Sequence, residues 1–354
     1  MVYFNPVVIR LKYQLMEEGK GGRIMKKAPS RFGKYVGIIC SLMLFVFSTG
    51  VAQAWQPDKP VEFVVPAGSG GGADQMARFV SPLISKYNLA PKPFIVINKS
   101  GGAGAEGFMY VKGKNRDPHE IIITLSNLFT TPLATGVPFS WKDLTPVARL
   151  ALDYFVLWVN AEAPYKTAKE YLDAVKKEPG KFLMGGTGTA QEDQIITIMI
   201  EQAFGVKFTY VPFKGGGDVA VELVGKHVNS TVNNPAEAVS HWKAGRLKPL
   251  AVIDHERIAL PDWDKIPTMK EDTGVDMSYM MLRGIFAAPG ITKEQQDFYV
   301  ECLKKATETP EWKKYVSDMG LKAAFLSGPD YPKWVGEQET IHKDLMTKGG
   351  LLKK

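Results

Sequence analysis

The sequence has few residues of the kinds that bind metals or act as nucleophiles. Its 354 residues include two cysteines and five histidines, and the histidines show neither a His-Glu-x-x-His motif nor a paired spacing, so no metal site is expected. It contains no Gly-x-Ser-x-Gly elbow and no Gly-Lys-Ser/Thr after a glycine run, which argues against a serine hydrolase and excludes a P-loop. We therefore expect no catalytic residue, no metal and no cofactor, and a protein that is not an enzyme.

The sequence also lacks a hydrophobic run long enough to span a bilayer. Its short apolar segment Gly37–Phe47 follows four basic residues between positions 26 and 34 and precedes the tripeptide Ala52-Gln53-Ala54. A basic region, a short apolar region and an A-x-A site are typical of a secretory signal. We expect residues 1–54 to be a leader and signal peptide, with Met25 as the true start, cleavage after Ala54 and a periplasmic mature chain. An uncleaved membrane anchor is the alternative.

Little net charge remains once this leader is set aside. The whole chain has 44 basic and 37 acidic residues, of which the leader holds eight and two, so the mature chain has 36 against 35, a formal charge of +1. This balance gives no reason to expect nucleic acid as a partner. Cys40 lies in the leader, so Cys302 is the single cysteine of the mature chain and cannot form an intrachain disulfide.

Alternating strand and helix patterns run through the mature chain. The β-branched strand Val61–Val65 leads through a glycine loop to an amphipathic helix over 73–87, and the alternation repeats in the middle of the chain. The first β-α-β-α-β alternation predicts a parallel sheet with helices on both faces, and the repeat in the middle of the chain predicts a second sheet. Together they predict an α/β fold in two lobes. We expect residues 55–153 and 254–354 to form lobe 1 and residues 154–253 to form lobe 2. A plain tandem pair of lobes is the alternative.

Four glycine-bearing loops each follow a predicted strand, at 66–74, 100–107, 185–190 and 213–217. Ligands of open α/β sheets lie outside the carboxyl ends of the strands, where these loops fall. A glycine loop that enters a helix also presents unpaired N–H groups and the positive end of the helix dipole. The loops predict an anion site in a cleft between the lobes, although each loop alone could be no more than a tight turn.

The loop Gly102–Gly107 also matches the Gly-x-Gly-x-x-Gly fingerprint of dinucleotide-binding proteins, with Asp117 and Glu120 downstream. This motif supports an NAD-dependent oxidoreductase as an alternative function. The fingerprint is expected in the first strand–helix turn of a domain, whereas here it comes second. An exported protein would also meet little nicotinamide cofactor, so we consider this alternative weaker.

Several segments within residues 55–350 have a distinctive order and spacing: Val64–Pro66, Gly70–Asp74 with Arg78, Asn98 with Gly101–Gly104, Gly186–Gly188 with Glu192 and Asp193, Tyr210–Gly216, and Lys243–Val252. Taken together, they resemble the extracytoplasmic solute receptors of tripartite tricarboxylate transporters, the TctC or Bug family. It implies a two-lobe periplasmic binding protein fold, type II-like, with a hinge and an interlobe cleft. It also implies a receptor that captures a small carboxylated organic acid.

The resemblance further implies how the ligand is held. Backbone N–H groups of Ser69–Asp74 would bind one carboxylate, with ordered water, and the loop Thr187–Ala190 would hold the other end. The pairs Ser126-Asn127 and Asn233-Asn234 would line the walls. The expected ligand-binding residues are Ala67, Ser69, Gly70, Gly71, Gly72, Ala73, Asp74, Ser126, Asn127, Thr187, Gly188, Thr189, Ala190 and Asn234.

Two positions depart from the family pattern, and one residue has two possible roles. Ala67 stands where an aromatic residue is frequent in the family, and Asn233 stands where an aspartate is common, so the identity of the ligand is open. Asp74 either touches the ligand or stabilises the first turn of the helix. The sequence does not distinguish these roles.

The resemblance also implies partners. The receptor would deliver its ligand to the large and small membrane subunits of a tripartite transporter, and we expect it to be a monomer that binds no nucleic acid. A periplasmic protein that passes its ligand to a signalling receptor would share the fold and the cleft, and is a second alternative.

Overall fold

A computed structural model describes residues 54–353, so the predicted signal peptide lies outside the described residues except for Ala54. The strands are β1 (Val61–Val65), β2 (Phe94–Asn98), β3 (Glu120–Thr124), β4 (Thr145–Asp153), β5 (Val156–Asn160), β6 (Leu183–Thr187), β7 (Thr209–Phe213), β8 (Ser230–Thr231), β9 (Leu247–Val252), β10 (Met281–Ala287) and β11 (Leu321–Ser327). The α-helices are α3 (Gly72–Lys86), α4 (Ala105–Lys112), α5 (Asn127–Thr135), α6 (Ala168–Lys177), α7 (Glu192–Phe204), α8 (Gly216–Val224), α9 (Pro235–Lys243), α10 (Met269–Thr273), α11 (Lys293–Glu308), α12 (Pro310–Asp318) and α13 (Asp330–Lys348). Two short 3₁₀ helices, η1 (Trp141–Asp143) and η2 (Trp263–Lys265), complete the described elements.

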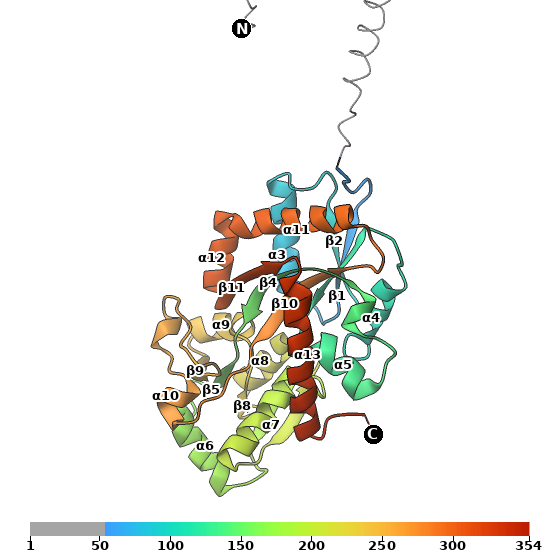
Figure 1. The fold of residues 1–354 in the computed structure, drawn as a ribbon. Helices are drawn as coiled ribbons and strands as arrows, with labels where there is room; N and C mark the ends of the chain where they lie inside the picture. The colour runs from blue at the N-terminus through green and yellow to red at the C-terminus, as the bar shows by residue number, and fades with distance from the viewer. Residues whose placement is uncertain (1–53, 354) are drawn as a thin grey trace, which may run out of the picture. The chain divides into compact units, whose positions relative to one another are not determined.

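The strands form two sheets, each surrounded by helices (Figure 1). The six-stranded sheet has the order β11-β4-β10-β3-β1-β2 and the five-stranded sheet the order β7-β6-β8-β5-β9. The α/β class and the two-lobe arrangement are as predicted, and the first three strands are parallel as predicted, but each sheet as a whole is mixed. Strand β1 pairs in parallel with β2 and β3, whereas β10 pairs antiparallel with both β3 and β4. The five-stranded sheet is mixed in the same way, because β5 is antiparallel to β8 and β9.

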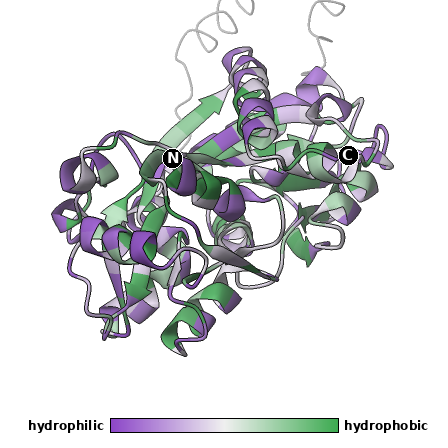
Figure 2. Ribbon diagram, turned by 90° about the horizontal axis from the view of Figure 1, so that it is seen from below, coloured by the Kyte–Doolittle hydropathy of each residue, from purple (hydrophilic) through white to green (hydrophobic). Residues whose placement is uncertain are grey.

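Apolar strands form the centre of each lobe, and polar residues lie mainly on the helices (Figure 2). Strands β1 and β3 are almost wholly buried, as expected for sheet strands that are covered on both faces. Helix α3 buries one stripe that includes Met76, Val80 and Leu83, which matches the helical period of the sequence. Burial of these stripes fixes the direction in which each helix runs from its preceding loop.

The chain passes between the lobes at β4–β5 and again between β9 and β10. The segment between β9 and β10 remains packed on the five-stranded sheet for most of its length. Trp263 packs against Trp158 and Trp242, and α10 contacts α6 and β9. The prediction places lobe 1 from residue 254 onward, whereas Trp263 and α10 pack on elements of lobe 2. The lobe boundaries remain predictions.

The end of the chain contacts the lobe of the five-stranded sheet as well. Helix α13 runs from the six-stranded sheet toward α7 (Figure 1), and the Gln202 side chain donates to the Lys348 carbonyl at 3.4 Å. Strand β11, which the sequence analysis did not predict, pairs antiparallel with β4. No helix of the described chain has the length and hydropathy of a membrane span.

Candidate functional site

A cavity of about 620 Å³ lies between the two sheets, at the carboxyl ends of their parallel strands. All four glycine-bearing loops identified in the sequence contribute to its wall. The six-stranded lobe supplies Pro66, Ala67, Gly68, Ser69, Gly71, Gly72, Ala73, Ser100, Ala103, Gly104, Leu125, Asn127 and Thr135. The five-stranded lobe supplies Thr187, Gly188, Thr189, Gln191, Glu192, Asp193, Phe213, Lys214, Gly215, Gly216, Gly217, Asp218, Asn234 and Glu237.

Helix N-termini from both lobes open into this cavity. Helix α3 begins at Gly72 after an extended Gly71 that supplies no side-chain cap, and α8 begins at Gly216 in the same way. The first turns of α7 and α9 also contribute lining residues. Uncapped helix N-termini carry unpaired N–H groups and a partial positive charge. The cavity therefore suits an anionic group that accepts hydrogen bonds from backbone amides.

Side chains that lie behind the first loop hold it in shape. Asp74 accepts hydrogen bonds from the Gly70 N–H at 2.9 Å, from Asn98 at 3.0 Å and from Arg78 at 2.9 Å. Burial alone would raise the pKa of Asp74, but these hydrogen bonds outweigh it and the pKa lies below its ordinary value. Asp74 and Gly70 are not among the cavity-lining residues. These contacts favour a structural role for Asp74 over contact with the ligand, and they include support of the loop before α3.

Of the pair Ser126-Asn127, Ser126 lies in the core and Asn127 lines the cavity. Ser126 is fully buried and accepts a hydrogen bond from the Tyr279 hydroxyl at 2.9 Å, so it does not reach the cavity. Asn127 lines the cavity and donates through Nδ2 to the Pro66 carbonyl at 3.0 Å. A Cβ atom at Gly104 would lie 2.6 Å from both groups of that bond, so glycine is needed for this close approach.

Side chains of α7 hold the loop of lobe 2 by accepting hydrogen bonds from its backbone N–H groups. The Thr187 N–H donates to the Asp193 carboxylate at 2.6 Å, and the Ala190 N–H donates to the Gln194 side chain at 2.6 Å. Ala190 has a left-handed backbone with φ of 57° and is buried outside the cavity wall. Thr187, Gly188 and Thr189 do line the cavity, so the structure brings these three residues to face the loop of lobe 1.

Four carboxylates line the cavity from lobe 2 and were not among the predicted ligand-binding residues: Glu192, Asp193, Asp218 and Glu237. Glu192 and Asp193 are buried in the first turn of α7, and the partly exposed Glu237 lies in the first turn of α9. Burial raises the pKa of Glu192 above its ordinary value, partly opposed by the charge of Arg283. Burial also raises the pKa of Asp193, and the charges of Glu192 and Glu237 raise it further. In the sequence analysis, Glu192 and Asp193 stood out only as part of the family resemblance.

Glu237 connects the two lobes. Its Oε1 accepts from the Gly72 N–H of α3 at 3.4 Å, and its Oε2 accepts from the Asn234 N–H at 3.3 Å. Burial raises the pKa of Glu237 to about 7, opposed by the charge of Arg283. A side-chain carboxylate of lobe 2 thus lies at the helix N-terminus that was predicted to hold the carboxylate of the ligand.

A buried ion pair lies beside this helix N-terminus. Arg283 of β10 pairs with Asp153 at the end of β4, and both side chains are almost completely buried. A Cβ atom on Gly72 would collide with the Arg283 guanidinium, so this glycine allows the cation to approach the first turn of α3. No sequence motif marked either residue, because the two lie 130 positions apart.

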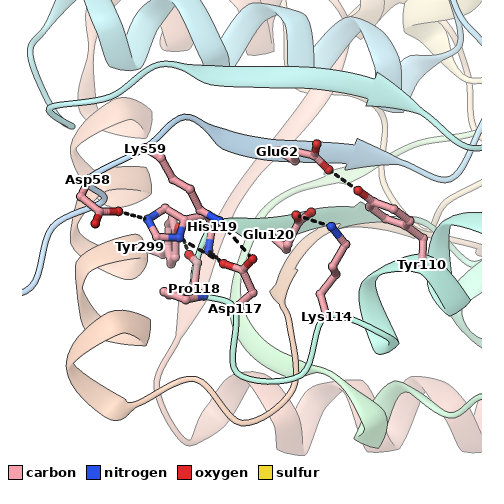
Figure 3. Close-up of polar contacts among 10 residues, drawn as sticks. All are labelled: Asp58, Lys59, Glu62, Tyr110, Lys114, Asp117, Pro118, His119, Glu120 and Tyr299. Atoms are coloured by element: carbon pink, nitrogen blue, oxygen red, sulfur yellow. Dashed lines mark hydrogen bonds and ion pairs between the residues drawn. The ribbon is translucent and has the colours of Figure 1, made fainter.

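A second polar cluster lies at the opposite end of the parallel strands, where β1 and β3 begin (Figure 3). Lys114 pairs with Glu120 at 3.0 Å, Tyr110 donates to Glu62, and His119 contacts Asp58 at 2.9 Å. Burial raises the pKa of Glu120 to about 7; Lys114 opposes this shift and Glu62 adds to it. Within residues 54–353, no three histidine, cysteine, aspartate or glutamate side chains are grouped so that they could hold a metal ion.

Comparison with known proteins finds a family with a similar sequence and solved structures with a similar fold. The model of the tripartite tricarboxylate transporter family receptor, TctC, matches residues 77–351. A curated protein of the gbd 5′ region of Cupriavidus necator is 26% identical over 300 residues, which cover 84% of this chain and 89% of that protein. The ligand-free crystal structure of a TctC solute-binding protein from Polaromonas is 28% identical, with a TM-score of 0.63, and covers 82% of this chain and 99% of its own. An R. palustris protein with adipate is 22% identical, with a TM-score of 0.79 over 84% of this chain and 99% of its own.

Proposed function

The chain belongs to the family of tripartite tricarboxylate transporter receptors, and from this premise we propose that it captures a small carboxylated organic acid in the periplasm. It then delivers this acid to the large and small membrane subunits of a tripartite transporter. The family is one of substrate-binding receptors, and we propose that this chain likewise binds its ligand without reacting with it. The predicted signal peptide over residues 1–54 supports export to the periplasm.

The observation that carries this proposal is the convergence of helix N-termini from two lobes on one cavity of about 620 Å³. The lobe 1 part of the wall contains no ionisable side chain, so the backbone amides around Gly71–Ala73 are the groups that would hold the carboxylate. Such amides are fixed in direction before the ligand arrives, and the dipole of α3 adds to their attraction for an anion. A carboxylate is the small organic anion that such donors hold well.

The proposed ligand also connects the lobes. Thr187–Thr189 and the first turn of α8 approach the cavity from lobe 2, so an acid held at α3 can reach both walls. A ligand that contacts both lobes binds the closed form better than the open form, and it shifts the population toward closure. The β4–β5 link and the connection from β9 to β10 are the proposed hinge. The closed monomer would present one surface to the membrane subunits.

Isothermal calorimetry and thermal shift of the mature chain against a panel of acids test the proposal. The panel contains dicarboxylates of increasing length, including adipate, together with tricarboxylates, aromatic acids and acidic amino acids. We expect at least one acid to bind at about micromolar affinity, roughly −8 kcal/mol, and to be recovered unchanged after incubation. Binding of NADH or nucleotides, with no response to any acid, would contradict the proposal.

A further inference from the structure

The carboxylate of Glu237 lies where three helices begin. Its Oε1 accepts a hydrogen bond from the Gly72 N–H at the start of α3, at 3.4 Å. A Cβ atom on Gly216, the first residue of α8, would collide with the same carboxyl group, so this group also lies against the first turn of α8. Its Oε2 accepts from the N–H of Asn234, the N-cap of α9, at 3.3 Å. An anion that belongs to the protein therefore occupies a position that three helix dipoles favour.

The ligand of the proposed receptor needs the same position. Its carboxylate would bind the amides around Gly71–Ala73, and the Gly72 N–H among them already donates to Glu237. Gly72, Gly216 and Glu237 all line the cavity. Among the described residues, Glu237 is the one side chain of lobe 2 that hydrogen-bonds to the first turn of α3. An incoming acid therefore meets an anion of the protein, and two ionised carboxylates in one site repel each other.

The ionisable groups around Glu237 are mostly acidic. Burial raises the pKa of Glu237 to about 7; the charge of Arg283 opposes this shift, and the charge of Asp153 adds to it. The other ionisable side chains of the lobe 2 wall and of the first turn of α3 are Glu192, Asp193, Asp218, Lys214 and Asp74. Arg283 is already paired with Asp153, and Lys214 is exposed. One more negative charge in the cavity therefore favours the protonated form of Glu237.

We propose that Glu237 takes the place of the ligand carboxylate in the empty receptor, and that it takes up one proton from solvent when an acid binds. The inference rests on the proposed receptor function and adds to it a residue that controls affinity through pH. In the bound form, the new O–H of Glu237 donates to the ligand carboxylate, so one proton is shared where two negative charges would repel. No other bond forms or breaks, and the proton returns to solvent when the acid leaves.

This arrangement makes acid binding depend on pH even for a ligand that does not titrate. The ligand carboxylate raises the pKa of Glu237 above its value of about 7 in the empty chain, so the bound receptor holds more protons near neutral pH. Affinity is then highest below pH 7 and falls as the pH rises toward the pKa of the bound form. Burial also raises the pKa of Glu192 and of Asp193, but in the described chain neither side chain hydrogen-bonds to α3. Replacing Glu237 alone should therefore abolish the effect.

Calorimetry at two pH values tests the inference in the wild-type mature chain. The probes are succinate, glutarate, adipate and benzoate, which are almost fully ionised at pH 6.5 and above. We expect the acid that binds best to bind about tenfold more weakly at pH 8.5 than at pH 6.5, because a tenfold change in affinity corresponds to a pKa change of about 1. At pH 7.5, titrations in two buffers of different ionisation enthalpy should show an uptake of about half a proton for each acid bound.

Two variants remove the titrating group. Glu237→Gln resembles protonated glutamate in shape and charge, and its amide can donate to the ligand. It should bind the acid equally at both pH values, without proton uptake, and about tenfold more tightly than the wild type at pH 8.5. Glu237→Ala removes the polar group altogether and should also lose the pH dependence, so the test does not depend on the folding of one variant.

Glu120→Gln is the matched control. Burial raises the pKa of Glu120 to about 7 as well, but Glu120 begins β3 at the end of the strands opposite to the cavity. This variant should keep the full pH dependence of acid binding and the full proton uptake.

The outcomes separate this inference from the receptor function. If the wild type binds an acid equally at both pH values and takes up no proton, the role of Glu237 is wrong and the carboxylate receptor stands. If the pH dependence and the uptake persist in Glu237→Gln and Glu237→Ala, another group takes the proton, which also overturns the inference. The same holds if Glu237→Gln weakens binding equally at both pH values, because the glutamate then supports the site and does not compete with the ligand. If no acid binds at either pH, the inference and the receptor function both fail.

Discussion

The two walls of the cavity are made of different chemistry. The lobe 1 wall consists of glycine, alanine, proline, leucine, serine, threonine and asparagine, whereas the lobe 2 wall includes Glu192, Asp193, Lys214, Asp218 and Glu237. A wall without ionisable side chains can hold an anion through its backbone alone, whose donors have fixed positions. A wall with several carboxylates attracts or repels a ligand group according to the charge of that group. In the proposed function, lobe 1 would hold the carboxylate common to all ligands, and lobe 2 would distinguish one acid from another.

Arg283 is a cation of lobe 1 that acts on the carboxylates of the lobe 2 wall. It belongs to β10 of the six-stranded sheet, yet its charge opposes the pKa shifts of both Glu192 and Glu237 on lobe 2. Among the buried side chains of the described chain, it is the one lysine or arginine. The charge of Arg283, a residue of the other lobe that lines neither wall, therefore favours the ionised form of these carboxylates.

Removing this cation should have the largest effect. Arg283→Met leaves Asp153 buried without its partner, and we expect the free energy of unfolding to fall by about 3–5 kcal/mol. Urea denaturation at pH 7 measures this loss. The double variant Arg283→Met/Asp153→Leu should recover most of it, because no uncompensated charge remains. If the free energy of unfolding of Arg283→Met lies within about 1 kcal/mol of the wild type, Asp153 does not need Arg283 as its charge partner in the folded chain.

A substitution at Gly71 in the lobe 1 wall should weaken ligand binding strongly without unfolding the chain. Gly71 is the N-cap of α3, with an extended backbone, and a Cβ atom there would meet the Gly68 carbonyl at an ordinary 3.5 Å. Aspartate is a favoured N-cap residue, and in Gly71→Asp its carboxylate would accept from the amides that the ligand needs. We expect the affinity for an acid to fall about 100-fold, roughly 2.7 kcal/mol, with a melting temperature close to that of the wild type.

The matched control for this substitution is Gly71→Ala, which adds a Cβ atom but no carboxylate. It should lose less than about fivefold in affinity, or roughly 1 kcal/mol. Calorimetry with the same acid measures both variants. Equal affinity of Gly71→Asp and the wild type would show that the carboxylate is held elsewhere, and the assignment of the binding role to lobe 1 would be wrong.

The two walls also differ in how far the sequence could predict them. The loop at 66–74 is continuous in the sequence, and a strand, a glycine run and a helix pattern are enough to predict a helix N-terminus that binds an anion. The same local signals predicted the α/β class. They did not predict the antiparallel strands β4 and β10, because strand direction depends on contacts between distant segments. Strand β11 was missed for a related reason, since it pairs with β4 from more than 150 positions away.

The lobe 2 wall was less accessible to sequence reasoning. Glu192 and Asp193 were visible, but a carboxylate in the first turn of a helix needs no functional explanation. Their burial, and their closeness in space to Asp153 and Glu237, which are distant in sequence, become apparent only in the folded chain. Ser126, Asp74, Gly70 and Ala190 show the opposite limit, because residues adjacent to lining residues can point away from the cavity. The ligand-binding residues named from the sequence remain predictions.

The smallest expected effect concerns the pH dependence of stability. Burial raises the pKa of Glu237 to about 7 from an ordinary 4.5, so the folded chain binds more protons than the unfolded chain between these values. The stability that protonated Glu237 contributes is therefore present below pH 4.5 and is lost as the pH rises to 7. Glu237→Gln cannot titrate, and its side chain can still accept from the Asn234 N–H. Because Glu237 is partly exposed, we expect the variant to gain only about 1–2 kcal/mol on the wild type between pH 5 and pH 8, measured by urea denaturation.

Glu120 is the control for this prediction, because its pKa is also raised to about 7 but it lies at the far end of β3 from the cavity (Figure 3). Glu120→Gln should show the same sign of pH dependence, since the cause is again burial. A saturating acid should change the pH dependence that Glu237 contributes, because the ligand occupies the same helix N-terminus, and should leave that of Glu120 unchanged. If the acid altered both equally, the effect would belong to the fold as a whole, and the contrast between the two walls would have no bearing on the ligand.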